Sequence, residues 1–382
     1  MSAPRFRRMT LVSLGVVIVA MLVLVSASYA STARKSAVGG HGAFNKQTAQ
    51  SAQAFGGMDA LIKAAQKEGT LNVIALPPTW ADYGKIISAF SAKYHIKIVS
   101  ENPDGNSQQE VDAVNQLKGT SRQPDVVDLA PTIMRANLSL FAPYRVVVWK
   151  QIPKSLKATN ALWYDDYTGY ESIGYSANLV KTPPKTVNDL LKSSYRGMVA
   201  LNGNPLTASA AFNGVAMAAL ANNGSASNIA PGVTFFHNLK HKGNLLPVDP
   251  TPATEASGQT PIVIDWDYNQ AGEAAAYPSL HWKWVIPANN IVSSYYQQAI
   301  VKNCPHPAAA RLWEEFVYST TGQNWFLRGG AHPVLQAHMT AAGTIDKAAL
   351  KRAPKVVGTP VQLTPAQQVK ATTYLQAHWS SI

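Results

Sequence analysis

The feature that most constrains the fold of this chain is an alternation of helix-like and strand-like segments that begins near residue 58. Short apolar runs have the length of buried strands, which are predicted at 70–76, 96–100 and 125–130. Segments with helical periodicity alternate with them, at 58–68, 82–94 and 107–118. A helix between two strands returns the chain to the same edge of a sheet, so such strands run parallel. The alternation therefore predicts an α/β unit built from parallel βαβ repeats.

A second block further along the chain repeats this alternation. Strands are predicted at 197–201 and 262–265, and helices at 208–222 and 233–242. Between the two blocks lies a stretch rich in Tyr and Gly, 162–180. A chain of 382 residues is long enough for two medium domains, so the two blocks predict two α/β units. Two further helices are predicted at 306–319 and 364–379.

Residues with strong positional preferences mark several helix ends. Gly69 is the expected stop of the first helix. The stretch SQQE, 107–110, has the pattern of a capping box that opens the third. Thr364 is the expected cap of the last helix, with Pro365 at its first position.

Composition narrows the class of protein. A hydrophobic fraction of 46% with a charged fraction of 14% is typical of a well-packed globular chain. The formal net charge is +12, but no long basic stripe is interleaved with aromatic residues, so we expect no nucleic-acid partner. The single cysteine, Cys304, allows neither a disulfide within the chain nor a cysteine-based zinc site, and we expect a buried, inert thiol.

Residues 1–30 have the pattern of a secretory signal. Arg5, Arg7 and Arg8 form a positive region, the apolar run 11–25 follows, and the triplet 28–30 places small residues where a signal peptidase reads. The apolar run is shorter than the roughly 20 residues of a membrane span, although an uncleaved anchor is the alternative. Residues 31–57 are rich in Ala, Ser, Gly and Gln and are predicted to be a flexible lead-in. We therefore expect a periplasmic or extracellular protein.

Five stretches, in this order and spacing, resemble the extracellular solute-binding proteins of ABC importers. They are EGTLNVIAL, PDVVDLAPT, GYESIGYSANLVKTPPKTVNDLLKSSYRGMVAL, GNPLTASAA and WVIPANN with AIVKNCPHPAAARLWEEFVYSTTGQNWF. The last is the most specific, because it is similar to the family's "HP.AA..F..F..S..GQ" ending. The branch that the chain resembles most includes binders of polyamines, ferric iron, thiamine and aminoethylphosphonate.

The resemblance implies an α/β, two-lobed, periplasmic-binding-protein-like (type II) fold, with a hinge and a ligand cleft between the lobes. Lobe 1 would comprise 58–165 plus 287–382, and lobe 2 would comprise 166–286. The chain would cross between lobes near 167–172 and 284–290, and the lobes would close on the ligand. The implied partners are a small-molecule ligand and an ABC permease in the inner membrane. We expect a monomer without a cofactor or a bound metal.

Ligands of open α/β sheets bind beyond the carboxyl ends of the strands. Polar loops follow the predicted strands at 77–80, 103–105, 131–132, 203–209 and 265–268. These loops and the aromatic first crossing supply the candidate ligand-binding residues: Trp80, Asp104, Thr132, Tyr167, Tyr170, Thr207, Ser209, Asp265, Trp266, Asp267 and Tyr268.

The stretch IVIDWDYNQAG, 262–272, ends an apolar run in two carboxylates with aromatic neighbours. Carboxylates pair with an ammonium group, and ring faces attract cations. The polyamine binders that the chain resembles use acidic and aromatic residues here, whereas the ferric binders use paired tyrosines and this chain offers only Tyr268. We expect Asp267, two residues beyond the strand, to face the ligand more than Asp265. The alternative is that Asp265 caps the next helix and Trp266 lies in the core.

The other candidates also have two readings. Thr207 and Ser209 precede an Ala-rich helix, where backbone N–H groups and hydroxyls bind a carboxylate, phosphate or phosphonate. The alternative for Thr207 is ordinary helix capping. Tyr167 and Tyr170 either line the hinge or pack in the core, and Trp80 either stacks on a ligand or packs in the core.

Nothing in the sequence has the pattern of a catalytic centre. His237 and His241 have a helical i, i+4 spacing, but neighbouring lysines repel a cation and favour a solvated face. Neither a GxSxG elbow nor a GxxxxGK loop is present. We therefore predict an exported binding protein, not an enzyme, with an amine-containing ligand that is polyamine-like or aminophosphonate-like. The alternatives are a ferric-iron or thiamine binder of the same family, or an enzyme on the two-lobed fold.

Overall fold

The computed structural model describes residues 45–382, which form one compact unit. Its strands are β1 (Thr70–Ile74), β2 (Lys97–Glu101), β3 (Val126–Leu129), β4 (Phe141–Ala142), β5 (Tyr164–Ser176), β6 (Val199–Leu201), β7 (Ile262–Trp266), β8 (Trp282–Val285), β9 (Ser293–Val301) and β10 (His332–Pro333). Its α-helices are α1 (Met58–Glu68), α2 (Tyr83–Tyr94), α3 (Ser107–Gln116), α4 (Pro131–Ala136), α5 (Ser209–Ala221), α6 (Ala230–His241), α7 (Pro252–Ala256), α8 (Asp267–Ala276), α9 (Pro307–Val317), α10 (Thr320–Arg328), α11 (Gln336–Ala341), α12 (Lys347–Arg352) and α13 (Pro365–His378).

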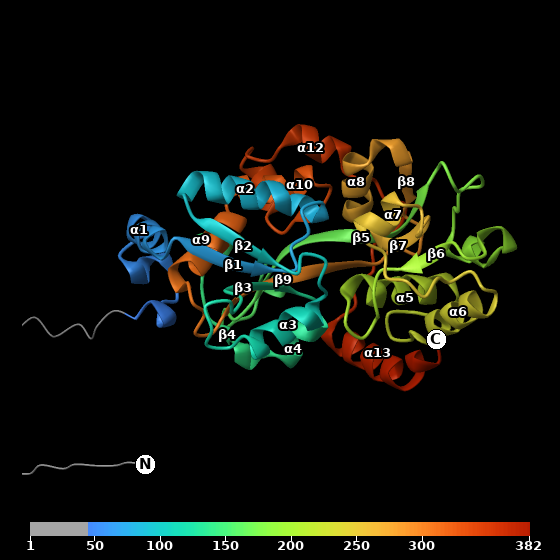
Figure 1. The fold of residues 1–382 in the computed structure, drawn as a ribbon, viewed down its shortest axis with the longest axis horizontal. Coiled ribbons are helices and arrows are strands. Elements are labelled where there is room, and N and C mark those ends of the chain that lie inside the picture. Colours follow the sequence, from blue (N-terminus) through green and yellow to red (C-terminus); the bar gives the residue numbers. More distant parts are fainter. Residues whose placement is uncertain (1–44) are drawn as a thin grey trace, which may run out of the picture. The chain divides into compact units, whose positions relative to one another are not determined.

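One long strand, β5, connects the two halves of the fold (Figure 1). Its first part, from Tyr164 to Tyr170, pairs with β9, and its second part, from Glu171 to Tyr175, pairs with β7. The larger sheet has the order β3–β9–β5–β7–β6. In addition, β4 pairs with β9, and β8 and β10 pair with β5. The predicted first crossing, 167–172, lies where β5 changes partner.

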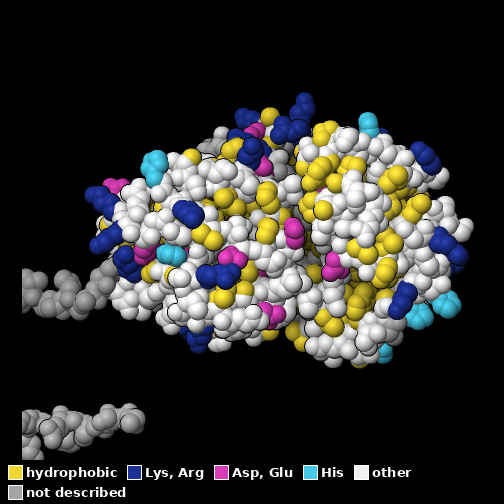
Figure 2. Space-filling view, viewed as in Figure 1, with side chains coloured by type: hydrophobic (Ala, Val, Ile, Leu, Met, Phe, Trp, Pro, Cys, Tyr) yellow, Lys and Arg dark blue, Asp and Glu magenta, His cyan; other side chains and the backbone are white. Residues whose placement is uncertain are grey.

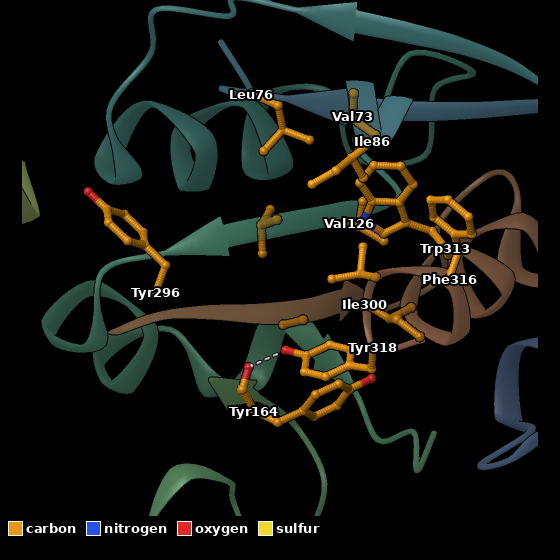
Figure 3. Packing of buried hydrophobic residues seen from close by; sticks show 14 of the residues in the cluster. Val73, Leu76, Ile86, Val126, Tyr164, Tyr296, Ile300, Trp313, Phe316 and Tyr318 are labelled. Atoms are coloured by element: carbon orange, nitrogen blue, oxygen red, sulfur yellow. Dashed lines mark hydrogen bonds between the residues drawn. The ribbon is translucent and has the colours of Figure 1, made fainter. Parts of the chain in front are cut away.

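Two hydrophobic cores form on the two sides of this connection, which makes the molecule two-lobed. The first core surrounds β1, β3, α2 and α9, where Ile86, Trp313 and Phe316 pack together (Figure 3). The second core surrounds β6, β7, α5 and α6 and includes Val215 and Phe236. The predicted two-lobed α/β fold is confirmed.

Parallel pairing is confirmed for β1 and β2, but the prediction is wrong for the third strand. β3 pairs antiparallel with β9 from the far end of the sequence. A link to β1 remains in the hydrogen bond that the Asp125 N–H donates to the Asn72 carbonyl at 2.9 Å.

Most of the predicted helix ends are confirmed. Gly69 ends α1 with a left-handed backbone, and Thr364 caps α13 through a capping box. The predicted cap of α3 is wrong by one residue, because Asn106 forms the capping box with Gln109. Ser107 lies inside the helix, where its hydroxyl oxygen accepts a hydrogen bond from the Ala130 N–H at 2.9 Å.

The last part of the predicted lead-in, 45–57, packs on the first core. Two short 3₁₀ helices form there, η1 (Lys46–Thr48) and η2 (Ala52–Phe55). The buried Arg311 guanidinium of α9 donates to the carbonyls of Ala49 and Gln47. A buried cation needs several acceptors, so this contact fixes the segment in place. The predicted signal, 1–30, and the rest of the lead-in lie outside the described residues.

The C-terminal helix α13 packs beside α4 and α6 (Figure 1). Leu363, Ala371 and Leu375 belong to the second core. The lobe boundaries drawn from the sequence stay a prediction, and we propose that the last helix belongs with lobe 2.

Within residues 45–382, none of the helices has the length and apolarity that crossing a bilayer requires.

Candidate functional site

Two adjoining cavities lie between the two lobes, and we refer to them together as the cleft. The larger has a volume of about 290 Å³ and the smaller about 60 Å³. Both are lined by Trp80, Asp104, Asn202, Pro250 and Thr251. Figure 2 shows acidic side chains on both sides of the hollow between the two halves of this face.

The cleft is built from segments that follow the strands, as predicted. Trp80 lies in the turn after β1, and Asp104 follows β2. From the other lobe, Asn202 follows β6 and Asp265 is near the end of β7. Strand-end side chains from both lobes therefore meet in one place.

The lining of the cleft is strongly acidic. Four carboxylates line the larger cavity, and three more line the smaller one, which gives seven: Asp104, Glu110, Asp128, Asp249, Glu255, Asp265 and Glu273. The described residues that line the two cavities include no Lys, Arg or His. Five of them are buried, whereas Asp104 and Asp249 are exposed. Buried carboxylates without a cationic partner favour a cationic occupant.

Three polar side chains line the smaller cavity together, Asp265 from β7 and Asn269 and Glu273 from α8. Asp265, Asn269 and Glu273 are four residues apart, which places helical residues on one side. Asp265 accepts hydrogen bonds from the Trp266 N–H at 2.7 Å and from the Asn269 amide at 2.9 Å. Glu273 accepts one from the Thr79 hydroxyl of the opposite lobe at 3.3 Å. This last bond bridges the cleft.

Burial raises the pKa of three carboxyl groups that line the smaller cavity. It raises the pKa of Glu255 to about 9, with repulsion from Glu273 and Asp265 adding to the effect. It raises the pKa of Glu273 to about 7 and that of Asp265 to about 6. In the larger cavity, burial raises the pKa of Asp128 to about 7. A positive charge in the cleft would offset these costs of ionisation.

Aromatic rings form one wall of the larger cavity. Trp80 and Tyr296 both line it and meet edge to face, with centroids 5.6 Å apart. The Trp80 indole N–H donates to the Tyr167 hydroxyl at 2.8 Å. Tyr167 and Tyr268 are buried behind this wall and pack against each other. The wall is thus held rigidly and presents Trp80 and Tyr296 to the cleft.

The structure brings four of the predicted site residues to the cleft and places the others elsewhere. Trp80, Asp104, Ser209 and Asp265 line it. Tyr167, Trp266 and Tyr268 are fully or almost fully buried in the core. Thr132, on α4, lines neither cavity, and the ring of Tyr170 packs on His332.

Thr207 does not cap α5, so the alternative interpretation of this residue, ordinary helix capping, is wrong. The cap position is Ala208, with no side-chain hydrogen bond, and the Thr207 hydroxyl donates to the Asn204 carbonyl at 3.3 Å. Ser209 begins the helix and lines the cleft together with Ala208 and Ala210. The start of α5 therefore faces the cleft without a side-chain cap.

The order of the two aspartates is the reverse of the one expected. β7 continues to Trp266, so Asp265 still belongs to the strand and lines the cleft. Asp267 is the first residue of α8, and its carboxylate accepts from the Tyr170 N–H at 2.7 Å. It lines a different cavity. The helix starts one residue beyond the strand and turns the two carboxylates apart.

Sequence reasoning missed several residues of the cleft, among them Asn202, Thr251, Glu255, Glu273 and Tyr296. The spacing of Asp265, Asn269 and Glu273 was a usable signal, because a helix was expected to follow the strand.

Within residues 45–382, no group of three or more His, Cys, Asp or Glu side chains has an arrangement that could hold a metal ion. His237 and His241 are exposed, and their rings stack 6.3 Å apart.

A two-lobed α/β fold with a polar cleft between the lobes is typical of solute-binding proteins, but the fold alone does not fix the function. The profile of the family "Bacterial extracellular solute-binding protein" matches residues 133–355, more than half of the chain. The chain belongs to this family, whose members bind small-molecule ligands outside the cytoplasm and work with ABC permeases. A search of curated proteins found no match.

Solved structures of binding proteins share the fold. Iron-bound HitA from Pseudomonas aeruginosa is 18% identical, with a TM-score of 0.58, covering 82% of this chain and 99% of that chain. AfuA from Actinobacillus pleuropneumoniae with fructose-6-phosphate is 15% identical, with a TM-score of 0.57, covering 81% and 98%. The spermidine/putrescine-binding protein PotD from Streptococcus pneumoniae is 14% identical, with a TM-score of 0.53, covering 82% and 99%. At these identities, the similarity shows the fold.

Proposed function

We propose that this solute-binding protein captures a small amine-containing solute in the cleft and delivers it to an ABC permease. The observation that carries the proposal is the lining of the cleft, which has seven carboxylates and no Lys, Arg or His among the described residues. Trp80 and Tyr296 add two ring surfaces to the same cavity. Carboxylates and ring faces together are the groups that bind an ammonium ion.

The electrostatics of the cleft support a cationic ligand. Burial raises the pKa values of Asp265, Glu273 and Glu255, so these three carboxyl groups are partly protonated near neutral pH. An ammonium group that enters the smaller cavity displaces these protons and pairs with the carboxylates. In this low-dielectric site, each pairing is stronger than it would be on the surface.

The start of α5 allows the ligand to carry an anionic group as well. Ala208, Ser209 and Ala210 line the larger cavity, and the helix has no side-chain cap. Unpaired N–H groups and a hydroxyl at a helix start bind phosphonate or carboxylate groups well. An aminophosphonate would use both ends of the cleft, whereas a polyamine would use the acidic residues alone.

A thermal-shift screen followed by isothermal titration tests this proposal. The panel contains diamines, polyamines, aminophosphonates, thiamine and ferric iron. We expect an amine at 100 times its Kd to stabilise the protein by about 2.7 kcal/mol. Stabilisation by ferric iron alone, or by no amine in the panel, would overturn the proposed ligand class. Mass spectrometry of the bound molecule before and after incubation should show it unchanged, and a converted product would indicate an enzyme.

We further propose that residues 1–30 are an export signal that is removed in the mature protein. The positive region, the apolar run and the small residues at 28 and 30 support this. N-terminal sequencing of exported protein should begin after Ala30. A sequence that begins at Met1 or Ser2 would indicate an uncleaved anchor.

A further inference from the structure

A second cavity, larger than the cleft, lies on another face of α8, and we call it the Arg352 cavity. Its volume is about 740 Å³. It is formed by the start of α2, by α8 and β8, and by the ends of α10 and α12.

Helix α8 separates this cavity from the cleft. Asn269 and Glu273 face the cleft, whereas Ala271 and Ala275 face the Arg352 cavity. A Cβ atom added at Gly272 would come within 2.4 Å of the Thr79 carbonyl oxygen, so the helix and the Thr79 loop are in tight contact. Thr79 lines both spaces. The two cavities are therefore distinct and share one wall.

The walls of the Arg352 cavity are largely apolar. Ala271 and Ala275 of α8, Trp284 of β8 and Leu327 of α10 contribute them. Such a surface favours the apolar body of a ligand, and its volume lies within the range of about 300–1,000 Å³ that small-molecule sites occupy.

Three cationic side chains surround these apolar walls. Arg328 forms an ion pair with Asp346 at 2.7 Å, and Lys85 lies near Asp82. The side chain of Arg352 is exposed and forms neither a hydrogen bond nor an ion pair with the described residues, 45–382. Two carboxylates also line the cavity, but Asp267 is buried with its Oδ1 held by the Tyr170 N–H, and Asp82 faces Lys85 and Arg328. The guanidinium of Arg352 thus remains uncompensated.

We propose that the Arg352 cavity binds a small organic anion with an apolar body, such as a medium-chain or aromatic carboxylate or sulfonate. The apolar part lies on Ala271, Ala275 and Trp284, and the anionic group pairs with Arg352. A planar guanidinium can donate two parallel hydrogen bonds to such a group. The acidic lining of the cleft disfavours an anion that carries no amine. The site does not depend on which solute the cleft binds.

Titration with the fluorescent probe 1-anilinonaphthalene-8-sulfonate tests this proposal, because the probe is a small aromatic anion. The full exported chain should bind it saturably, and dodecanoate should displace it. Arg352→Glu reverses the unpaired charge and should weaken binding at least tenfold. Lys351→Glu makes the same charge change at an exposed residue that does not line the cavity, and it should bind the probe like the parent.

A second variant removes the space without changing the charge. Ala275 is exposed at the wall, so Ala275→Trp should fold normally, fill the cavity and abolish saturable binding. The proposal is overturned if the parent protein shows no saturable binding, if Arg352→Glu and Ala275→Trp bind the probe as tightly as the parent, or if Lys351→Glu weakens binding as much as Arg352→Glu does. A thermal melt of each variant shows whether it is folded at the temperature of the titration, which excludes binding of the probe to unfolded protein.

Discussion

The two cavities on either side of α8 differ in charge, because cationic side chains line only the Arg352 cavity, where they stand beside Asp82 and Asp267. The cleft is lined by seven carboxylates, whereas Lys85, Arg328 and Arg352 surround the apolar walls of the other cavity. One helix supplies both surfaces, because residues four apart share a face and residues two apart do not. The two faces of α8 differ in polarity, because Asn269 and Glu273 line the cleft whereas Ala271 and Ala275 line the other cavity, and the cationic side chains come from α2, α10 and α12. The net charge of +12 gives no indication of the acidic cleft.

The largest expected effect separates the two aspartates that flank Trp266. Asp265→Asn keeps the shape of the side chain and removes a charge from the cleft. Removing one partner of a buried charge pair costs about 2–5 kcal/mol, so the affinity for the amine should fall about 30-fold or more. Isothermal titration with the amine found in the screen measures this loss.

Asp267→Asn is the matched control, because the same atoms change on the other side of Trp266. Its carboxylate binds the Tyr170 N–H and lines the Arg352 cavity, so the substitution should lower the melting temperature and leave amine affinity nearly unchanged. If Asp267→Asn alone loses the amine, the two cavities are assigned to the wrong aspartates.

The wall between the cavities is the target of the next prediction. Gly272→Ala places a methyl group where the Thr79 carbonyl lies within 2.4 Å, so α8 or the Thr79 loop must shift. Overpacking of this kind costs roughly 1–3 kcal/mol. Thermal melts should show a lower melting temperature than in Ala276→Ser, which changes an exposed residue at the end of the same helix. Equal melting temperatures for the two variants would contradict this prediction, because they would mean that α8 or the Thr79 loop can shift without a loss of stability.

Much of the fold could be predicted from the sequence, because it follows from local patterns. Helix ends are set by nearby residues: Gly69 ends α1, and Thr364 with Pro365 begins α13. Short apolar runs mark the strands β1, β3 and β7. The antiparallel pairing of β3 with β9 could not be predicted in the same way. It joins segments more than 150 residues apart, and neither strand carries a signal for its partner.

Less of the site could be predicted, because it depends on where a strand ends. Asp265 and Asp267 look equivalent in the sequence, and only the start of α8 at Asp267 turns them to different cavities. Glu255 reaches the cleft from the short helix α7, which no apolar pattern marks. Tyr296 is a residue of a long buried strand, and its role as a wall depends on the T-shaped contact with Trp80.

The pH dependence of binding sharpens the contrast between the two cavities. Burial raises the pKa of Asp265 to about 6 and that of Glu273 to about 7, so protons compete with an ammonium ligand. Amine affinity should therefore rise with pH, by roughly tenfold between pH 5 and pH 7 for one carboxylate with a pKa near 6. The sulfonate probe at Arg352 meets no such competition and should not gain affinity with pH. Titrations at pH 5, 6, 7 and 8 compare the two, and a pH-independent amine affinity would contradict carboxylate pairing.

The smallest expected effect concerns the aromatic wall of the cleft. Trp80→Ala removes a ring that lines both parts of the cleft, and a cation–π contact contributes about 0.5–2 kcal/mol. The affinity for an amine should fall by roughly 2- to 30-fold. Trp80→Phe keeps a ring face but loses the indole N–H that donates to Tyr167, so it separates the ring from the hydrogen bond. If the phenylalanine variant binds like the parent and the alanine variant does not, the ring face holds the ligand. If both variants bind like the parent, the carboxylates alone account for binding, and Trp80 serves only to pack against Tyr296 and Tyr268.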